Sequence, residues 1–198
     1  MNESYPRSER RDAAENRQRI LTTALQLFEQ QGVDHVSMNQ IATAARIGPG
    51  TLYRRYRNKS ELCLDLIKDS LVSLFDDIDA YLAQHQTMPP RDRLKEVLRL
   101  FISYRERKLQ LLAGVEEGAS VNGPRSTMQS PLYVELHEVM VNLFREMGLT
   151  GETGSNGVFR ADMLLTALKN DAYVFQRDVR GYSPDAFLEQ LRLTFFPD

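Results

Sequence analysis

The sequence predicts an all-α protein. Apolar residues recur at intervals of three and four along most of the chain, which is the spacing that places them on one face of a helix. Residues typical of helix ends stand where these patterns start and stop, and no segment alternates apolar and polar residues as a strand does. The length of 198 residues and the hydrophobic content of 42% are typical of a soluble protein with one or two domains.

The first predicted helix covers residues 14–31. Ile20 and Phe28 lie on its apolar face, and Gly32 is placed to end it. Residues 1–13 have little to bury, so we expect a flexible N-terminal tail there.

Two short helices are predicted within residues 37–56. Ser37 and Gln40 form the capping-box pattern S-x-x-Q at the start of the first of these helices. We expect Gly48, which is free to adopt a positive φ, to close that helix, and Pro49 to occupy the first turn of the next one. The chain therefore makes a tight turn between two short helices.

The second short helix has an outer face rich in hydrogen-bond donors. Leu52 and Tyr56 are four residues apart and turn inward, which leaves hydroxyl groups, two guanidiniums and no acid outside. The outward residues are Thr51, Tyr53, Arg54 and Arg55. Such donors match phosphate oxygens and base edges in a DNA major groove, so we interpret the pair as a helix-turn-helix. The alternative is a polar helix on an ordinary helical protein.

The charge of the chain is unevenly distributed. The net charge is −2, but residues 1–60 hold ten Lys and Arg against six Asp and Glu, a net +4 that leaves −6 on the remainder. This asymmetry favours a nucleic-acid-binding head on a body that does not touch phosphates. Arg7, Arg10 and Arg11 fit either a basic arm that reaches a DNA groove or a solvated tail.

Further helices are predicted after the turn. A long helix begins at Lys59, with Asn58 as its N-cap and Glu61 at the capping-box position, and continues to about Gln84. Pro89 and Pro90 then break the pattern. Helices are next expected over residues 90–108, 131–147, 158–179 and 184–195, with a shorter apolar piece at 109–115 and connections at 118–129 and 148–157.

The motifs around the turn resemble the DNA-binding domain of the TetR family of transcriptional regulators. The shared pattern is Gly32, Val36-Ser37-Met38, Ile41-Ala42, Gly50-Thr51-Leu52-Tyr53, Tyr56 and Lys59-Ser60-Glu61-Leu62. The resemblance implies a three-helix helix-turn-helix domain over residues 14–74 and a C-terminal helical bundle over residues 75–198 for ligand binding and dimerisation. Many members have Ser where this chain has Gly48, and Phe is commoner at Tyr56 and His at Arg55.

The same resemblance implies which residues contact DNA, with Lys59 holding a phosphate. The expected DNA-binding residues are Ser37, Met38, Gly48, Gly50, Thr51, Tyr53, Arg54, Arg55, Tyr56 and Lys59.

It further implies a repressor that binds a pseudo-palindromic double-stranded operator as a homodimer and is released by an apolar or aromatic small molecule. The last two helices would form the dimer interface, with Leu164, Leu168, Phe175, Phe187, Leu191 and Phe195 as its candidates. The candidates for the effector pocket are Phe101, Tyr104, Leu112, Met140, Phe144 and Phe175, with plain core packing as the alternative for each.

Two other function classes compete with this interpretation. An enzyme is disfavoured, because the sequence has no nucleophile elbow, phosphate-binding loop or set of metal ligands, and we expect no catalytic residue, metal or cofactor. An architectural or adaptor DNA-binding protein would use the same motif without an inducer. Cys63 is the only cysteine, and no apolar run suits a secretory signal or membrane span, so we expect a cytoplasmic protein.

Overall fold

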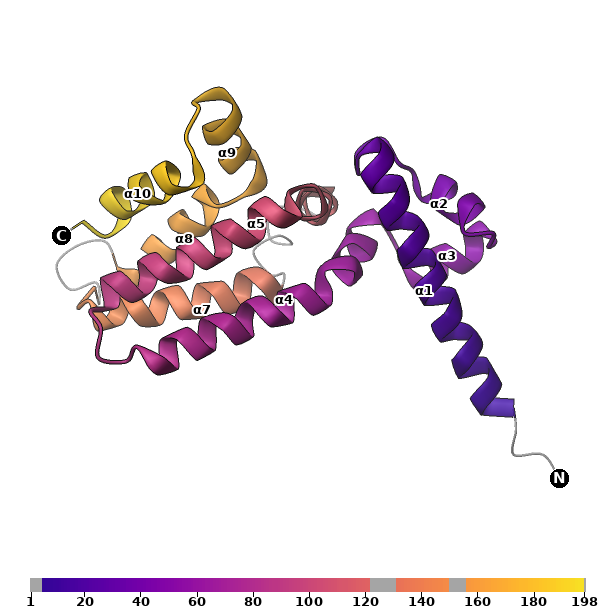
Figure 1. Ribbon diagram of the computed structural model, residues 1–198, viewed down its shortest axis with the longest axis horizontal. Coiled ribbons are helices and arrows are strands. Elements are labelled where there is room, and N and C mark those ends of the chain that lie inside the picture. Colours follow the sequence, from indigo (N-terminus) through magenta and orange to yellow (C-terminus); the bar gives the residue numbers. More distant parts are fainter. Residues whose placement is uncertain (1–4, 122–130, 150–155, 198) are drawn as a thin grey trace. The chain divides into compact units, whose positions relative to one another are not determined.

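A computed structural model of the chain describes residues 5–121, 131–149 and 156–197, and the regular structure of these residues is helical (Figure 1). The chain forms two compact units. The first contains Met1–Lys68 and Gln110–Gly118, and the second contains Asp69–Leu109 and Ala119–Asp198. No helix in the described ranges is long and apolar enough to cross a membrane.

The N-terminal part of the first unit is built from three helices and the start of a fourth. They are α1 (Tyr5–Gln31), α2 (Met38–Ala44), α3 (Pro49–Arg55) and the N-terminal part of α4 (Lys59–Gln84). α2 packs against both α1 and α3 (Figure 1). The core between them consists of Ile20, Ala24, Phe28, Ile41, Ala42, Leu52, Leu62 and Cys63, all nearly inaccessible to solvent.

Helix α1 is longer than the sequence analysis predicted. It begins at Tyr5, so residues 5–13, assigned above to a flexible tail, are helical. Pro6 lies in the first turn, where a missing N–H breaks no helical hydrogen bond, and no further glycine or proline occurs before Gly32. Gly32 ends the helix with a φ of 82°, as predicted. Residues 1–4 lie outside the described part of the chain.

Helix α5 (Pro90–Val121) contains both the helix predicted over residues 90–108 and the apolar piece at 109–115. The expected division between them is present as a kink, because Lys108 has non-helical backbone angles (φ −122°, ψ 19°) inside the continuous helix. Residues 118–121 of the predicted loop at 118–129 are helical, since α5 continues to Val121, and the rest of that segment lies outside the described residues.

The segment of α5 beyond the kink packs within the first unit, which the sequence did not suggest. A Cβ atom placed on Gly114 would lie 2.8 Å from Cys63 Sγ and 2.8 Å from Val33 Cγ1. Ser60 Oγ also donates a hydrogen bond of 2.8 Å to the carbonyl oxygen of Val115. Only glycine allows α5 to approach α4 this closely.

The second unit contains the remainder of α4 and α5 and all later helices. These are α7 (Pro131–Glu146), α8 (Gly157–Ala167), α9 (Asn170–Val174), the π-helical turn η1 (Phe175–Val179) and α10 (Pro184–Phe195). α7 packs along α8, and α10 contacts both α8 and η1. The core includes Leu94, Val97, Leu98, Phe101, Leu136, Met140, Phe144, Leu164, Leu165, Leu168 and Leu188.

The helix predicted over residues 158–179 is interrupted. α8 stops at Ala167, and Lys169 is extended (φ −62°, ψ 155°) before α9 starts at Asn170. No glycine or proline marks this break, so the apolar periodicity alone could not locate it. The last helix was predicted correctly, with Ser183 as its N-cap.

Gly114→Ala should destabilise the first unit. The added methyl group overlaps Cys63 and Val33, and overpacking of this kind costs about 1–3 kcal/mol in unfolding free energy. Urea denaturation measures the change, with Gly50→Ala as the control, because a Cβ at Gly50 meets nothing within 4 Å. Equal stability of the two alanine variants would contradict the close packing.

Candidate nucleic-acid interface

Helix α2 begins with the capping box that the sequence predicted. The backbone N–H of Gln40 donates to Ser37 Oγ at 3.2 Å, and the backbone N–H of Ser37 donates to Gln40 Oε1 at 2.7 Å. Ser37 is exposed at the start of the helix, whereas Met38 is buried, with 7% of its surface exposed. Met38 is held in the core, away from the surface on which the sequence analysis expected it to contact DNA.

The turn after α2 is a Schellman motif. The N–H of Ile47 donates to the carbonyl of Ala42 at 3.0 Å, and the N–H of Arg46 donates to that of Thr43 at 3.1 Å. This pattern places Arg46 in the left-handed region, with a φ of 55°. The expectation of a positive φ at Gly48 was wrong, since Gly48 has a φ of −66°.

Helix α3 starts directly after this turn. Gly48 is its extended N-cap and Pro49 its first residue, so a missing proline N–H costs no hydrogen bond. Leu52 is fully buried and Tyr53 is 45% exposed. Gly50 and Arg54 are also exposed, and Thr51 is half-buried. The outer face of α3 therefore presents a phenol and a guanidinium, as predicted.

Arg55 and Tyr56 at the end of α3 make contacts within the protein. Arg55 Nη1 donates to the carbonyl oxygen of Ala13 in α1 at 3.1 Å, although the residue is exposed. Tyr56 is only 4% exposed, and its hydroxyl donates to Asp65 Oδ2 at 2.5 Å. The expectation that Tyr56 contacts DNA therefore conflicts with its buried position.

The ammonium group of Lys59 is also used inside the first unit. Its Nζ donates to the carbonyl oxygens of Val33 at 2.6 Å and Val36 at 3.2 Å. These carbonyls belong to the segment between α1 and α2. Lys59 thus ties the start of α4 to that segment. The sequence alone could not predict this role, because Lys59 and Val36 are 23 positions apart.

Asp65 of α4 is the centre of a polar network. Arg17 of α1 donates to both carboxylate oxygens, from Nε at 2.9 Å and from Nη2 at 2.5 Å. The hydrogen bonds from Arg17 hold the pKa of Asp65 below its ordinary value. Burial, followed by the hydrogen bond to Asp65, raises the pKa of Tyr56 to about 12.

The sequence analysis did not include three exposed polar residues of α2 and of the turn between α2 and α3 among the candidates for DNA binding. Arg46 lies in the turn, and Asn39 and Thr43 lie on α2 away from its buried side. The sequence could have indicated that they are exposed, because Asn39 and Thr43 lie off the apolar face of α2 and Arg46 lies between the two helices.

The predicted effector-pocket residues separate into three groups. Phe101, Tyr104, Met140 and Phe144 are buried in the second unit, whereas Leu112 is buried in the first. Phe175 is 42% exposed and lies 5.2 Å from the guanidinium of Arg180, so it does not line an interior pocket. The sequence analysis did not include Arg105, which is fully buried and donates to the Tyr133 hydroxyl at 3.2 Å.

Most predicted dimer residues belong to the core of the second unit. Leu164 and Leu168 are fully buried, and Phe187 and Leu191 are 5% and 4% exposed. Phe195 is half-buried. Large apolar side chains instead reach solvent on the other side of the same helices, at Val158, Phe159, Met163 and Leu193.

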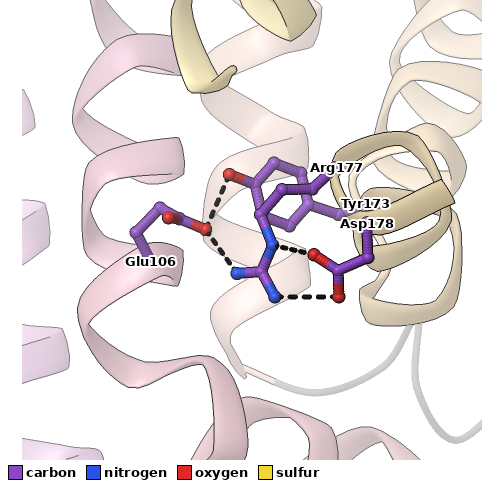
Figure 2. Close-up of polar contacts among 4 residues, drawn as sticks. All are labelled: Glu106, Tyr173, Arg177 and Asp178. Atoms are coloured by element: carbon purple, nitrogen blue, oxygen red, sulfur yellow. Dashed lines mark hydrogen bonds and ion pairs between the residues drawn. The ribbon is translucent and has the colours of Figure 1, made fainter. Parts of the chain in front are cut away.

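A second polar cluster joins η1 to α5. Glu106 Oε1 accepts the hydroxyl of Tyr173 at 2.8 Å and Nη1 of Arg177 at 3.0 Å, while Arg177 also pairs with Asp178 at 2.6 Å (Figure 2). Burial raises the pKa of Tyr173, and the contact with Asp178 raises the pKa of Arg177. No group of His, Cys, Asp and Glu within the described residues could hold a metal ion.

Comparison with known proteins finds relatives along nearly the whole chain. A profile of the family described as "Bacterial regulatory proteins, tetR family" matches residues 20–66. An HTH-type transcriptional regulator of Staphylococcus aureus strain USA300 is 33% identical over 186 residues, covering 92% of this chain and 93% of the relative.

Solved structures share the fold. FadR of Thermus thermophilus, a TetR-family transcriptional repressor in complex with lauroyl-CoA, matches with a TM-score of 0.68 at 23% identity, over 89% of this chain and 92% of that one. A transcriptional regulator from Saccharomonospora viridis in complex with choline matches with a TM-score of 0.60 at 19% identity, over 90% and 94%.

Acid should remove the stability that Asp65 contributes. Because its pKa is lowered on folding, its contribution is complete above the unfolded-state pKa of about 3.9 and is lost as the pH falls through the lower folded-state value. Urea unfolding of the wild type and Asp65→Asn should therefore differ most near pH 6 and converge toward pH 2. A difference that stays constant over this range would contradict the assignment.

Proposed function

Because this chain belongs to the TetR family of DNA-binding transcriptional regulators, we propose that it is a repressor that binds a pseudo-palindromic operator as a homodimer and is released by a small molecule. Its relatives are regulators and not enzymes, so catalysis is set aside. We further propose that it acts in the cytoplasm, where an operator is accessible.

The exposed face of α3 is the observation that carries the operator-binding proposal. Tyr53 and Arg54 point away from the core on a helix without an acidic residue, and Arg46 adds a third donor from the turn. A guanidinium recognises the O6 and N7 atoms of guanine in the major groove, and a phenol hydroxyl serves bases or phosphates. Ser37 and Gly50 lie exposed at the starts of α2 and α3.

The homodimer is proposed to form through an apolar surface on α8 and α10. Phe159 and Met163 are 55% and 40% exposed, four residues apart on α8, and Leu193 on α10 is 49% exposed. α10 contacts α8, so these side chains belong to neighbouring helices. Exposed apolar groups gathered in this way mark interaction surfaces. A two-fold dimer would place its recognition helices about 34–36 Å apart, one turn of DNA.

The effector is proposed to bind inside the second unit, among the aromatic and methionine side chains of α5 and α7. Phe101, Tyr104, Met140 and Phe144 are all buried there, beside the polar pair of Arg105 and Tyr133. Release from DNA requires that the effector bind the DNA-incompetent state more tightly. FadR holds lauroyl-CoA and the Saccharomonospora viridis regulator holds choline, and these differ so much that neither identifies the effector of this chain.

An architectural protein without an effector is the remaining alternative. It needs the exposed face of α3 but no ligand site in the second unit. A thermal-shift screen of apolar and aromatic compounds separates the two, because an effector present at a hundred times its dissociation constant stabilises the folded protein by about 2.7 kcal/mol. Absence of any stabilising compound would favour the architectural alternative.

Tyr53→Ala should weaken operator binding without destabilising the protein. Tyr53 is exposed, and loss of a good base contact costs about 1–3 kcal/mol, which is about fivefold to a hundredfold in affinity. Lys59→Ala should weaken binding too, but it should also lower the unfolding free energy by about 1–3 kcal/mol, because the carbonyls of Val33 and Val36 lose their donor.

Gel-shift titration on a duplex enriched by the wild type from a random-sequence library measures affinity, and urea denaturation measures stability. Both variants should remain dimeric in sedimentation velocity. Unchanged binding by Tyr53→Ala would refute the role of α3. A Lys59→Ala variant of full stability would refute the internal role of the ammonium group.

Met163→Glu should dissociate the dimer. A carboxylate at the centre of an apolar interface loses its hydration, and the expected rise in the dimer dissociation constant is at least about tenfold. Leu193→Glu should act in the same way. Val72→Glu on α4, which also replaces an exposed apolar side chain (55% exposed), is the matched control.

Sedimentation velocity at micromolar concentration compares these proteins without DNA. The wild type and Val72→Glu should sediment as dimers, and Met163→Glu as a monomer with wild-type helical content. A monomeric wild type, or a dimer that tolerates both glutamates, would reject this interface.

A further inference from the structure

Three helices of the first unit meet at one carboxylate. Asp65 extends from α4 and receives two hydrogen bonds from Arg17 of α1 and one from Tyr56, the residue that caps the C-terminal end of α3. The side chain of Asp65 is only 20% exposed and that of Arg17 is 37% exposed. The carboxylate is therefore largely shielded from water, and the paired donors of Arg17 hold it in a defined direction.

Helix α3 is held by packing against α2, by a hydrogen bond from Arg55 to the carbonyl oxygen of Ala13, and by the contact of Tyr56 with Asp65. The helix has seven residues, and Leu52 is the buried residue among them. Apolar burial at Leu52 fixes how close α3 lies to the core, but it is non-directional and constrains rotation and tilt weakly. Tyr56 follows Leu52 by one helical turn, and the 2.5 Å hydrogen bond from its hydroxyl to Asp65 supplies a directional constraint on the less exposed side of the helix end, whereas Arg55 is exposed.

We propose that Asp65 is a positioning residue for sequence-specific DNA binding: by holding Tyr56 against Arg17, it sets the orientation in which α3 presents Tyr53 and Arg54 to base edges. This role rests on the operator binding proposed above. Base edges are read through hydrogen bonds of defined geometry, whereas contacts to the repeating phosphates carry no sequence information. Loss of the Asp65 contact should therefore reduce the preference for the operator and leave general DNA affinity in place.

Asp65→Asn tests this role, with Asp69→Asn as its matched control. Both substitutions remove one negative charge from α4, but Asp69 is exposed. The probes are the duplex that the wild type enriches from a random library and a scrambled duplex of the same composition. Fluorescence anisotropy at one salt concentration gives both affinities, and circular dichroism verifies that each variant is folded.

Asp65→Asn should lower the ratio of operator affinity to scrambled-duplex affinity about tenfold relative to Asp69→Asn, with the scrambled-duplex affinities of the two variants agreeing within about twofold. If Asp65→Asn fails to fold, Tyr56→Phe replaces it, because this change keeps the ring and the Arg17–Asp65 pair while removing the hydroxyl. It should lower the same ratio several-fold, by less than the loss of the carboxylate.

An unchanged ratio in a folded variant overturns the positioning role while operator binding stands. Equal weakening on both duplexes also overturns it, because a merely structural carboxylate would reduce all DNA binding together. A wild type that enriches no sequence from the library overturns the operator-binding proposal and this role with it.

Discussion

Two helices of seven residues form the surface proposed to read DNA, and helices this short are not stable alone in water. This constraint determines much of the first unit. The capping box of Ser37 and Gln40 supplies partners at the start of α2, and the Schellman turn at Arg46 supplies them at its end. Burial of Leu52 and the hydrogen bond of Tyr56 then hold α3 in place. Gln40, Leu52 and Tyr56 thus order the surface proposed to read DNA without being proposed to contact it.

The same division of roles separates residues that family resemblance groups together. Lys59 and Tyr56 belong to the matched motif, yet their polar atoms contact carbonyls and a carboxylate inside the first unit. Tyr53 and Arg54 remain available to a partner. In the second unit, the inward faces of α8 and α10 form the core, and their opposite faces leave apolar side chains exposed. Burial and internal hydrogen bonds therefore distinguish the motif residues that hold the first unit together from those that remain exposed.

Local patterns were predictable and distant contacts were not. Ser37, Gly32 and Ser183 act within a few residues of their positions, so their caps could be identified from the sequence. The placement of a positive φ at Gly48 failed because the Schellman hydrogen bonds, and not residue type, select Arg46. The packing of Gly114 on Cys63 joins residues far apart in the chain. Likewise, helical spacing could not tell the core side of α8 from its exposed side, because both carry apolar residues.

The most direct test of sequence-specific binding is a fluorescence-anisotropy titration of the wild type with DNA from immediately upstream of its own gene. A scrambled duplex is titrated beside it at several salt concentrations. We expect the native sequence to bind about a thousandfold or more tightly than the scrambled one at physiological salt. Equal, weak binding to both duplexes that is lost as salt rises would mean phosphate contact alone and would contradict recognition of an operator at that site.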